Sequence, residues 1–289
     1  MRERHKKLKH AVYLASPMLN KKLSALSTTS PSGDVGQRTI IRPLARALAL
    51  LDAFDTKYHW LSNSDLCERT GLPASTVSRQ TQCLVKLGYL RHAPKLRKYS
   101  LDSSVLSLGY AAIAHSRVQR LAAKQMRTLA DKHAVHVILS TRDRLNLIVV
   151  ERAVSPTSSI ALSVNVGDRF DLGSSPIGWA LLAALPDVEQ YYLLDNIERR
   201  LPLEWSRIKR RASLAMSQVK NEGYCTSLGE WNSDLGTVAT PLMVSGHAPL
   251  VIACIGASNY LSRTRVERTL GPELVGIAMS IQEEAGESK

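Results

Sequence analysis

Apolar residues spaced three or four apart predict a first helix over residues 43–54. Its apolar face is formed by Leu44, Ala47, Leu48, Leu51 and Phe54. A second helix is expected to end near Thr70, and either Ser62 or Asn63 is suited to cap its start. Gly71 then supplies the left-handed residue that ends this helix and turns the chain sharply into a third one. Two helices joined by such a turn are typical of a helix-turn-helix.

The third helix, within the segment GLPASTVSRQTQCLVKLGYLR, separates apolar from polar positions. Val77, Leu84, Val85 and Leu87 can point inward. The polar face consists of Ser75, Thr76, Ser78, Arg79 and Gln82. Hydroxyl, amide and guanidinium groups of this kind suit base edges and phosphates. The alternative is a small structural helical hairpin with a solvated basic turn.

A basic hairpin is expected directly after the third helix. Its charges are Arg91, Lys95, Arg97 and Lys98, placed around Ala93 and Pro94. Four cations on one loop suit a minor groove or a phosphate backbone, as in the wing of a winged helix-turn-helix. Arg42 and Arg46 flank the apolar face of the first helix and are further candidates for phosphate contacts, although a solvated arginine is the commoner explanation for either alone.

The remaining two thirds of the chain mix helical and strand patterns. The expected helices cover residues 105–113, 117–133, 177–185, 205–222 and about 265–284, and the expected strands cover residues 135–140, 145–151, 160–166, 235–243 and 250–257. Val105, Leu108 and Ala112 share one face of the first of these helices, which suits packing against a partner subunit. The pattern predicts an α+β protein, and 289 residues allow two domains.

Positive charge is concentrated in the first part of the chain. Residues 1–100 hold 18 Lys and Arg against 6 Asp and Glu, a net charge of +12, whereas residues 101–289 hold 20 against 19, a net charge of +1. This asymmetry indicates a polyanion partner for the N-terminal part and a ligand-binding or assembly role for the rest.

Residues 1–38 are interpreted as a flexible basic arm. A basic start and a short apolar patch resemble a signal peptide, but Pro17 and Asn20 break the apolar run and no convincing cleavage site follows. No run approaches the roughly 18 apolar residues of a membrane span. The sequence therefore predicts a cytoplasmic protein.

The sequence gives little support for a metal site, a disulfide bond or an enzyme active site. Cys67, Cys83, Cys225 and Cys254 are far apart, which favours four reduced thiols. The pair His133 and His136 lacks further ligands nearby, so we expect neither a metal nor a cofactor. Motifs such as GxSxG, a phosphate-binding glycine loop and HExxH are absent from the sequence. Cys225 is the nearest candidate nucleophile, without a recognisable base, so we expect no enzyme.

Five segments together resemble the IclR family of bacterial transcriptional regulators. They are RALALLDAF, GLPASTVSRQTQCLVKLGYL, KYSLDSSVLSLG, VGDRFDLGSSPIGWALLAALP and NEGYCTSLGEWNSDLGTVATPL, in the order the family has them. The resemblance covers about residues 40–285. It implies a winged helix-turn-helix over 39–101, a linker helix over 102–116, and a GAF-like effector-binding and oligomerisation domain over 117–285, with an antiparallel sheet flanked by helices.

The resemblance also implies an effector pocket between the sheet and a loop that opens a helix. Pro176 and Ile177 match the start of that helix, and Leu162 matches the pocket floor. The matching positions downstream are Ser227, Leu235, Thr237, Cys254 and Gly256. Two departures bear on the ligand. Trp179 replaces a lysine of many members, and Asp234 replaces a common glycine, which favours a larger or aromatic molecule unless either residue faces solvent or a subunit interface.

The function implied is sequence-specific regulation of a catabolic operon, as repressor, activator or both. The expected partners are double-stranded operator DNA, a small organic acid or aromatic catabolite, and a second copy of the chain in a homodimer, possibly a dimer of dimers. Two other functions remain open, namely a DNA-binding protein without an effector and an enzyme built on the C-terminal domain.

Overall fold

The computed structural model describes residues 41–55, 58–113 and 116–286. The chain separates into two compact units with a boundary between His115 and Ser116, and each unit is described by itself. The predicted basic arm, residues 1–38, lies outside the described residues. Within the described residues, no helix is long and apolar enough to cross a membrane.

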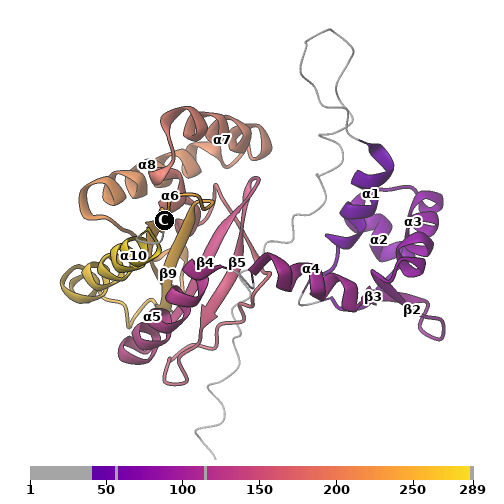
Figure 1. The fold of residues 1–289 in the computed structure, drawn as a ribbon. Helices are drawn as coiled ribbons and strands as arrows, with labels where there is room; N and C mark the ends of the chain where they lie inside the picture. The colour runs from indigo at the N-terminus through magenta and orange to yellow at the C-terminus, as the bar shows by residue number, and fades with distance from the viewer. Residues whose placement is uncertain (1–40, 56–57, 114–115, 287–289) are drawn as a thin grey trace, which may run out of the picture. The chain divides into compact units, whose positions relative to one another are not determined.

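The N-terminal unit is a helix-turn-helix followed by a β-hairpin (Figure 1). Its elements are α1 (Arg42–Leu51), β1 (Leu61–Ser62), α2 (Asn63–Thr70), α3 (Ala74–Lys86), β2 (Leu90–Ala93), β3 (Lys98–Leu101) and α4 (Ser103–Ile113). The strands form a small sheet in the order β1-β3-β2, with both pairs antiparallel. Leu50, Leu66, Val77 and Leu90 meet in the core, so α1, α2, α3 and the hairpin pack on one another.

The sequence-predicted cap and turn of α2 are confirmed. Ser62 accepts a hydrogen bond from the backbone amide of Asp65, and the Asp65 carboxylate accepts one from the backbone amide of Ser62. This reciprocal pair satisfies two amides at the start of the helix. Gly71 ends α2 with a φ of 68°, a left-handed conformation that glycine adopts without steric cost. The relative orientation of α2 and α3 is thereby set by local chemistry.

The linker helix α4 is apolar yet exposed. Leu106 and Tyr110 are 75% and 67% exposed, and Leu108 is exposed as well. Exposed apolar residues at this density on one helix are unusual for a surface that faces only water. The predicted role of α4 in packing against a partner subunit stays a prediction.

The C-terminal unit places helices on both faces of an antiparallel sheet, as expected of the α+β class. Its first elements are α5 (Arg117–His133), β4 (His136–Asp143), β5 (Asn146–Ala153), β6 (Arg169–Asp171), α6 (Pro176–Ala184), α7 (Asp187–Arg200) and α8 (Trp205–Glu222). Then follow β7 (Cys225–Asn232), β8 (Leu235–Leu242), β9 (Leu250–Ala257), α9 (Arg263–Arg265), a π-helical turn (Val266–Leu270) and α10 (Gly271–Gly286). The described strands are ordered β6-β5-β4-β9-β8-β7.

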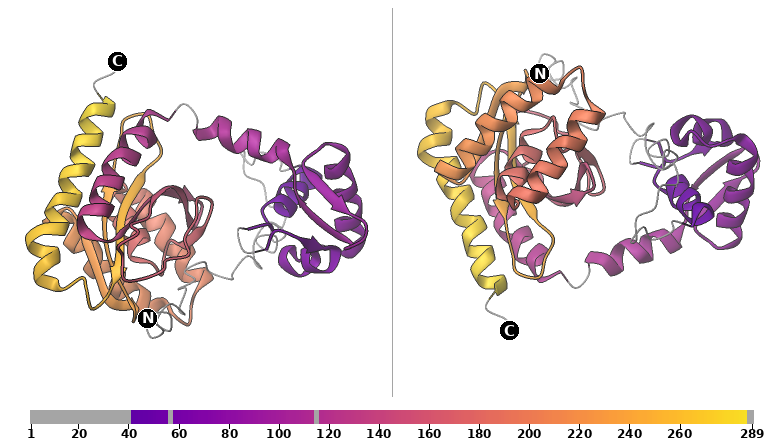
Figure 2. Two further views of the ribbon diagram at one scale, coloured as in Figure 1. Left: turned by 90° about the horizontal axis from the view of Figure 1, so that it is seen from below. Right: turned by 90° about the horizontal axis from the view of Figure 1, so that it is seen from above.

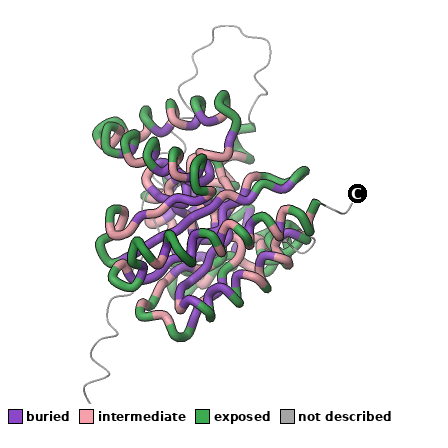
Figure 3. Tube along the Cα trace, turned by 90° about the vertical axis from the view of Figure 1, so that its left-hand side faces the viewer, coloured by how far each residue is buried: buried purple, intermediate pink, exposed green. Residues whose placement is uncertain are grey.

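Each face of this sheet has its own hydrophobic core. Helices α5 and α10 lie side by side on one face, where Met126, Leu139 and Leu274 are buried (Figure 2). Helices α6 and α8 cover the other face, where Ile138, Ile177 and Leu181 are buried. The strands run between these layers as the most buried part of the unit (Figure 3). Side chains that alternate along a strand therefore enter different cores.

Several predicted elements differ from the structure. The predicted strand over residues 160–166 is wrong, because this segment is a loop in which only Leu162 forms an isolated bridge. Gly167, at a φ of 93°, folds the loop back so that its amide donates to the carbonyl of Val149 on β5. Strands β6 and β7 and helix α7 were not expected, and the last helix begins at Gly271 after the π-helical turn.

Candidate functional site

Helix α3 presents a polar face that is held in place by its buried face. Val77 and Leu84 lie in the core, and the Thr81 hydroxyl donates to the backbone carbonyl of Val77. Of the predicted contact residues, Ser75, Arg79 and Gln82 are exposed, whereas Thr76 and Ser78 are half-buried. The polar face is therefore fixed in rotation, and its long side chains project outward.

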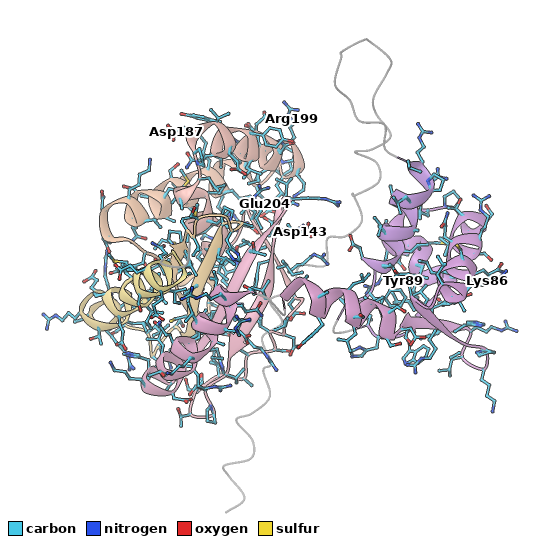
Figure 4. The ribbon with its side chains drawn as sticks, viewed as in Figure 1. Lys86, Tyr89, Asp143, Asp187, Arg199 and Glu204 are labelled. Atoms are coloured by element: carbon cyan, nitrogen blue, oxygen red, sulfur yellow. The ribbon has the colours of Figure 1, made fainter. Side chains whose placement is uncertain are left out.

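Lys86 and Cys83 extend this face and were missed by sequence reasoning. Arg79, Gln82, Cys83 and Lys86 follow one another at intervals of three, one and three residues, which places all four on one side of the helix. All four are exposed, and Lys86 at the end of α3 is labelled in Figure 4. The interval of seven residues between Arg79 and Lys86 was the signal that could have identified the lysine.

The β2–β3 hairpin forms a basic wing. Its strands pair with His92 opposite Tyr99 and Ala93 opposite Lys98, and the two rings stack with centroids 4.7 Å apart. Arg97 adopts a φ of 50° in the connecting turn. Lys95 and Arg97 are exposed at the tip, and Lys98 is half-buried at the start of β3. The stacked pair anchors a tip that carries two exposed cations.

The other predicted arginines have different surroundings. Arg91 lies at the base of the hairpin, where its guanidinium carbon is 5.3 Å from the centroid of the Trp60 ring and its Nη2 atom is 3.4 Å from Ser100 Oγ. Arg42 is exposed at the start of α1, and Arg46, one turn later, is half-buried. Arg91 is thus oriented by its neighbours, which is compatible with a backbone contact but leaves it less reach than the wing-tip cations.

In the C-terminal unit, the start of α6 is held by hydrogen bonds to residues of the preceding loop. Ser175 caps the helix by accepting from the amide of Gly178, and Ile177 is buried directly after Pro176. Trp179 is 3% exposed, and its indole Nε1 donates to the carbonyl of Gly173 at 2.6 Å. Trp179 is therefore buried and does not face solvent, and its predicted contact with an effector stays a prediction.

A row of residues crosses the sheet on the α6 face. The strand register places Ser227 opposite Thr237, Thr237 opposite Ile255, and Ile255 opposite His136. Residues that lie directly opposite each other on paired strands have their side chains on the same face of the sheet. All four residues of this row therefore point to one face. Three of the four are polar, although most buried side chains on this face are apolar. We call these four residues the polar row.

The polar row is only partly satisfied. Ser227 Oγ donates to Glu230 and accepts from the amide of Trp231. His136 Nε2 lies 2.9 Å from the carbonyl oxygen of Ile160. Among the described residues, neither His136 Nδ1 nor Thr237 Oγ1 has a hydrogen-bond partner, although both atoms are buried. Burial lowers the pKa of His136, against the opposing effect of the hydrogen bond to Ile160, and the positive charge of Arg152 lowers it further. The neutral ring is therefore favoured.

Leu162 and Leu235 pack on the same core as the polar row, but three predicted effector residues do not share its face. Cys254 belongs to the core under α5 and α10, and a Cβ atom at Gly256 would meet Val135 and Leu261 of that layer. Asp234 is exposed in the β7–β8 turn. Grouping Cys254 and Gly256 with Thr237 was therefore wrong, because adjacent positions of a strand point to opposite faces.

The predicted effector residues do not line the groove of about 400 Å³ that lies between α5 and α10. Its lining includes Arg120, Lys124, Gln125, Ile277 and Glu284, all of which belong to the opposite layer. Within the described residues, no group of three or more His, Cys, Asp or Glu side chains is placed to hold a metal ion.

Cys225, the candidate nucleophile, has the wrong surroundings for that role. It is fully buried, and its Sγ atom lies 3.4 Å from the carbonyl oxygen of Pro176. Burial raises the pKa of the Cys225 thiol to about 12, so the thiolate needed for nucleophilic attack is scarce at neutral pH. The contact instead joins β7 to the first turn of α6.

Comparison with known proteins gives consistent matches along both units. The family described as the IclR helix-turn-helix domain matches residues 43–94, and that described as bacterial transcriptional regulator IclR C-terminal matches residues 110–282. The HTH-type transcriptional regulator TsaQ1/TsaQ2 of Comamonas testosteroni is 30% identical over 247 residues, covering 85% of this chain and 88% of the relative.

Solved structures agree with the fold. An IclR family transcriptional regulator from Brucella abortus has a TM-score of 0.79 and 33% identity, covering 88% of this chain and 96% of that chain. An IclR homologue from Microbacterium hydrocarbonoxydans, solved in complex with 4-hydroxybenzoate, has a TM-score of 0.65 and 20% identity, covering 84% of this chain and 98% of that chain. The second likeness supports the fold alone.

Proposed function

Because the chain belongs to the IclR family of transcriptional regulators, we propose that its N-terminal unit binds operator DNA under the control of an organic effector bound by the C-terminal unit. The chain is a DNA-binding transcriptional regulator, and its relatives imply that it is not an enzyme. The observation that supports the DNA contacts proposed below is the exposed face of α3, where Arg79, Gln82 and Lys86 project beside a basic wing.

In this proposal α3 enters the major groove and the wing follows the backbone or the minor groove. Arg79 and Gln82 have the side chains suited to base edges, and Ser75, Thr76 and Ser78 are short enough for phosphates or adjacent bases. Lys95, Arg97 and Lys98 contact DNA without reading its sequence. Arg42, Arg46 and Arg91 add phosphate contacts at the edges of the interface.

We further propose that the protein acts in the bacterial cytoplasm as a homodimer, possibly as a dimer of dimers. The exposed apolar side chains of α4, Leu106, Leu108 and Tyr110, supply a surface for that contact. Two winged units then read half-sites about one helical turn of DNA apart.

The proposed effector is an organic acid or aromatic catabolite, and the controlled genes are a catabolic operon. The complex of the Microbacterium hydrocarbonoxydans homologue with 4-hydroxybenzoate supports an aromatic ligand in a protein of this fold. The proposed binding region is the α6 face of the sheet, near Leu162, Ile177, Ser227, Leu235 and Thr237. Effector and operator affinities must then be coupled reciprocally.

The test is fluorescence anisotropy with a duplex from the DNA upstream of the protein's own gene, a scrambled duplex, and a panel of aromatic and aliphatic acids. We expect tighter binding to the upstream duplex and a change in affinity with at least one compound. Equal affinity for the two duplexes would contradict specific recognition. Specific binding that no compound alters would favour the alternative of a DNA-binding protein without an effector.

A further inference from the structure

Resting on the proposed effector role of the C-terminal unit, we propose that the polar row takes a hydroxylated ring compound whose hydroxyl group donates a hydrogen bond to His136 Nδ1. The site would therefore select a ligand with a donor at that position, and a bare carboxylate or an ether there would leave the ring nitrogen unsatisfied.

The tautomer of His136 determines which kind of group it needs. A backbone carbonyl only accepts hydrogen bonds, so the nitrogen that faces the carbonyl of Ile160 at 2.9 Å, Nε2, carries the proton. In the neutral ring Nδ1 is then an acceptor with a free lone pair. The environment favours the neutral ring, because burial lowers the pKa of His136 by more than the hydrogen bond to Ile160 raises it, and the positive charge of Arg152 lowers it further. A partner for Nδ1 must donate.

The orphaned atoms lie where a ligand of the proposed effector site would lie. His136 is 4% exposed and Thr237 is fully buried, and among the described residues neither His136 Nδ1 nor Thr237 Oγ1 has a partner. A buried acceptor or hydroxyl without a hydrogen-bond partner carries a free-energy cost. A ligand that satisfies both atoms recovers that cost, which an apolar ligand on the same face does not.

The spacing of the polar row sets the shape of the ligand. His136 and Thr237 flank Ile255 across β4, β9 and β8, so their Cα atoms are two strand spacings apart, or about 10 Å. The side chain between them is apolar. A compound that reaches both carries polar groups at two ends of a flat apolar body, as a substituted aromatic ring does. The hydroxyl of Thr237 can donate or accept, so only the His136 end is restricted.

Access requires the covering segments to move. Helix α6 packs over β8 and β9, and the loop that holds Ile160 packs on the same core. Because Thr237 is fully buried, a ligand reaches it only when α6 or this loop shifts. A ligand that binds only the shifted arrangement raises the population of that conformation. An effector needs such a shift between two conformations of the C-terminal unit.

The experiment compares matched pairs of probes by isothermal titration calorimetry on the full chain. The pairs are phenol and anisole, 3-hydroxybenzoate and 3-methoxybenzoate, and 4-hydroxybenzoate and 4-methoxybenzoate. In each pair one methyl group replaces the hydroxyl hydrogen and removes the donor. We expect the hydroxylated member of at least one pair to bind about 10- to 100-fold more tightly, as expected when its partner leaves a buried acceptor unpaired. Equal affinity within every pair that binds overturns the proposal.

Variants locate the donor contact. His136→Phe should bring the affinity ratio of the selective pair close to one, and Thr237→Val should weaken both members. Ser140→Ala is the matched control, because Ser140 Oγ is also buried and unpartnered on this face but lies four residues, about 13 Å, along β4 from His136. Full selectivity in a folded His136→Phe variant would overturn the assignment.

A measurement on the unaltered protein covers the case in which His136→Phe does not fold. With ¹⁵N-labelled histidine, NMR should show a protonated Nε2 and a lone pair on Nδ1, and the Nδ1 resonance should shift with the hydroxylated probe but not with its methoxy partner. A protonated Nδ1 in the free protein overturns the proposal.

Failure of the inference and failure of the proposed function look different. If a methoxy compound binds more tightly than its hydroxylated partner and alters DNA affinity, the effector role stands and the donor requirement is wrong. If no probe binds while specific DNA binding is intact, the donor proposal is overturned and the protein is assigned to the class without an effector of this kind.

Discussion

The indole Nε1 atom of Trp179 donates a hydrogen bond to the carbonyl oxygen of Gly173 at 2.6 Å, which ties the first turn of α6 to the loop before it. Trp179 belongs to the hydrophobic core on the face of the sheet that carries the polar row. This contact therefore helps to set how firmly α6 is held against the sheet.

Replacing Trp179 with phenylalanine should destabilise the C-terminal unit by about 1–3 kcal/mol, because the Gly173 carbonyl loses its buried donor and a smaller ring leaves space. Urea unfolding followed by circular dichroism measures the change. Trp205→Phe is the control, since Trp205 is half-buried at the start of α8. An equal loss in the two variants would indicate a general effect of ring size.

Arg79→Ala should weaken binding to the upstream duplex by about 1–3 kcal/mol and binding to the scrambled duplex much less, because a guanidinium that reads bases discriminates between sequences. Anisotropy titrations on both duplexes give the two values. Equal losses would remove Arg79 from the base-reading set.

Lys95→Ala should weaken binding to both duplexes alike and lower the salt slope of log K by about one, as expected for a lost phosphate contact. Titrations over a range of salt concentrations measure the slope. Lys209→Ala, which removes an exposed cation from α8 in the other unit, should leave the slope unchanged. If Lys95→Ala lowered affinity for the upstream duplex only, Lys95 would be a residue that recognises the base sequence and not a phosphate contact.

Gly178→Ala should be strongly destabilising, by about 1–3 kcal/mol or more, because a Cβ atom there would lie 2.0 Å from the backbone oxygen of Leu172. Backbone atoms cannot move aside as a flexible side chain does. Gly276→Ala in α10 meets nothing within 4 Å and should be neutral or stabilising, since alanine favours helix. Thermal unfolding of the pair separates steric overlap from helix propensity, and similar melting temperatures would contradict the close approach.

Stability of the N-terminal unit should depend on pH through Asp65. Hydrogen bonds from the Ser62 backbone and side chain lower the pKa of Asp65, and the positive charges of Lys98 and Arg69 contribute further, against the opposing effect of burial. The folded state thus favours the carboxylate. Its contribution is fully present above the unfolded pKa, roughly 3.9, and is lost as pH falls through the lower folded value.

Subtracting the unfolding free energies of Asp65→Asn from those of the unaltered protein at several pH values isolates this contribution. The difference should be constant at neutral pH and shrink below about pH 4. Ser62→Ala should cost about 0.5–2 kcal/mol by removing the cap. A difference that grew as the solution became more acidic would contradict the sign of the effect.

Elements defined by local chemistry were predictable from sequence. The cap at Ser62 and the glycine turn after α2 rest on short-range signals, and helix 205–222 agrees with α8 at both ends. Helix α7 was not predicted from the sequence because its apolar side chains do not all lie on one buried face. Val188, Tyr191 and Tyr192 are exposed, so periodicity over Asp187 to Arg199, labelled in Figure 4, is blurred.

The candidate effector face was harder to predict because its sheet is covered on both sides. Strand β9 reads LVIACIGA, an unbroken apolar run that does not reveal which residues share a face. Cys254 and Gly256 were consequently grouped with residues of the opposite layer. His136 was not identified from the sequence for a related reason. Its proposed ligand contact depends on alignment with Ile255 and Thr237, which only the strand register supplies.

Strand β9 lies between β4 and β8 and sends Ile252 and Cys254 into one core and Ala253 and Ile255 into the other. A slip of one residue would exchange these sets and bring Gly256 into line with the histidine. Neither layer can reach its native packing while this strand is misaligned. The C-terminal unit is therefore expected to melt in a single cooperative transition, with both layers lost together, whereas the N-terminal unit, with its own core, can melt at a different temperature.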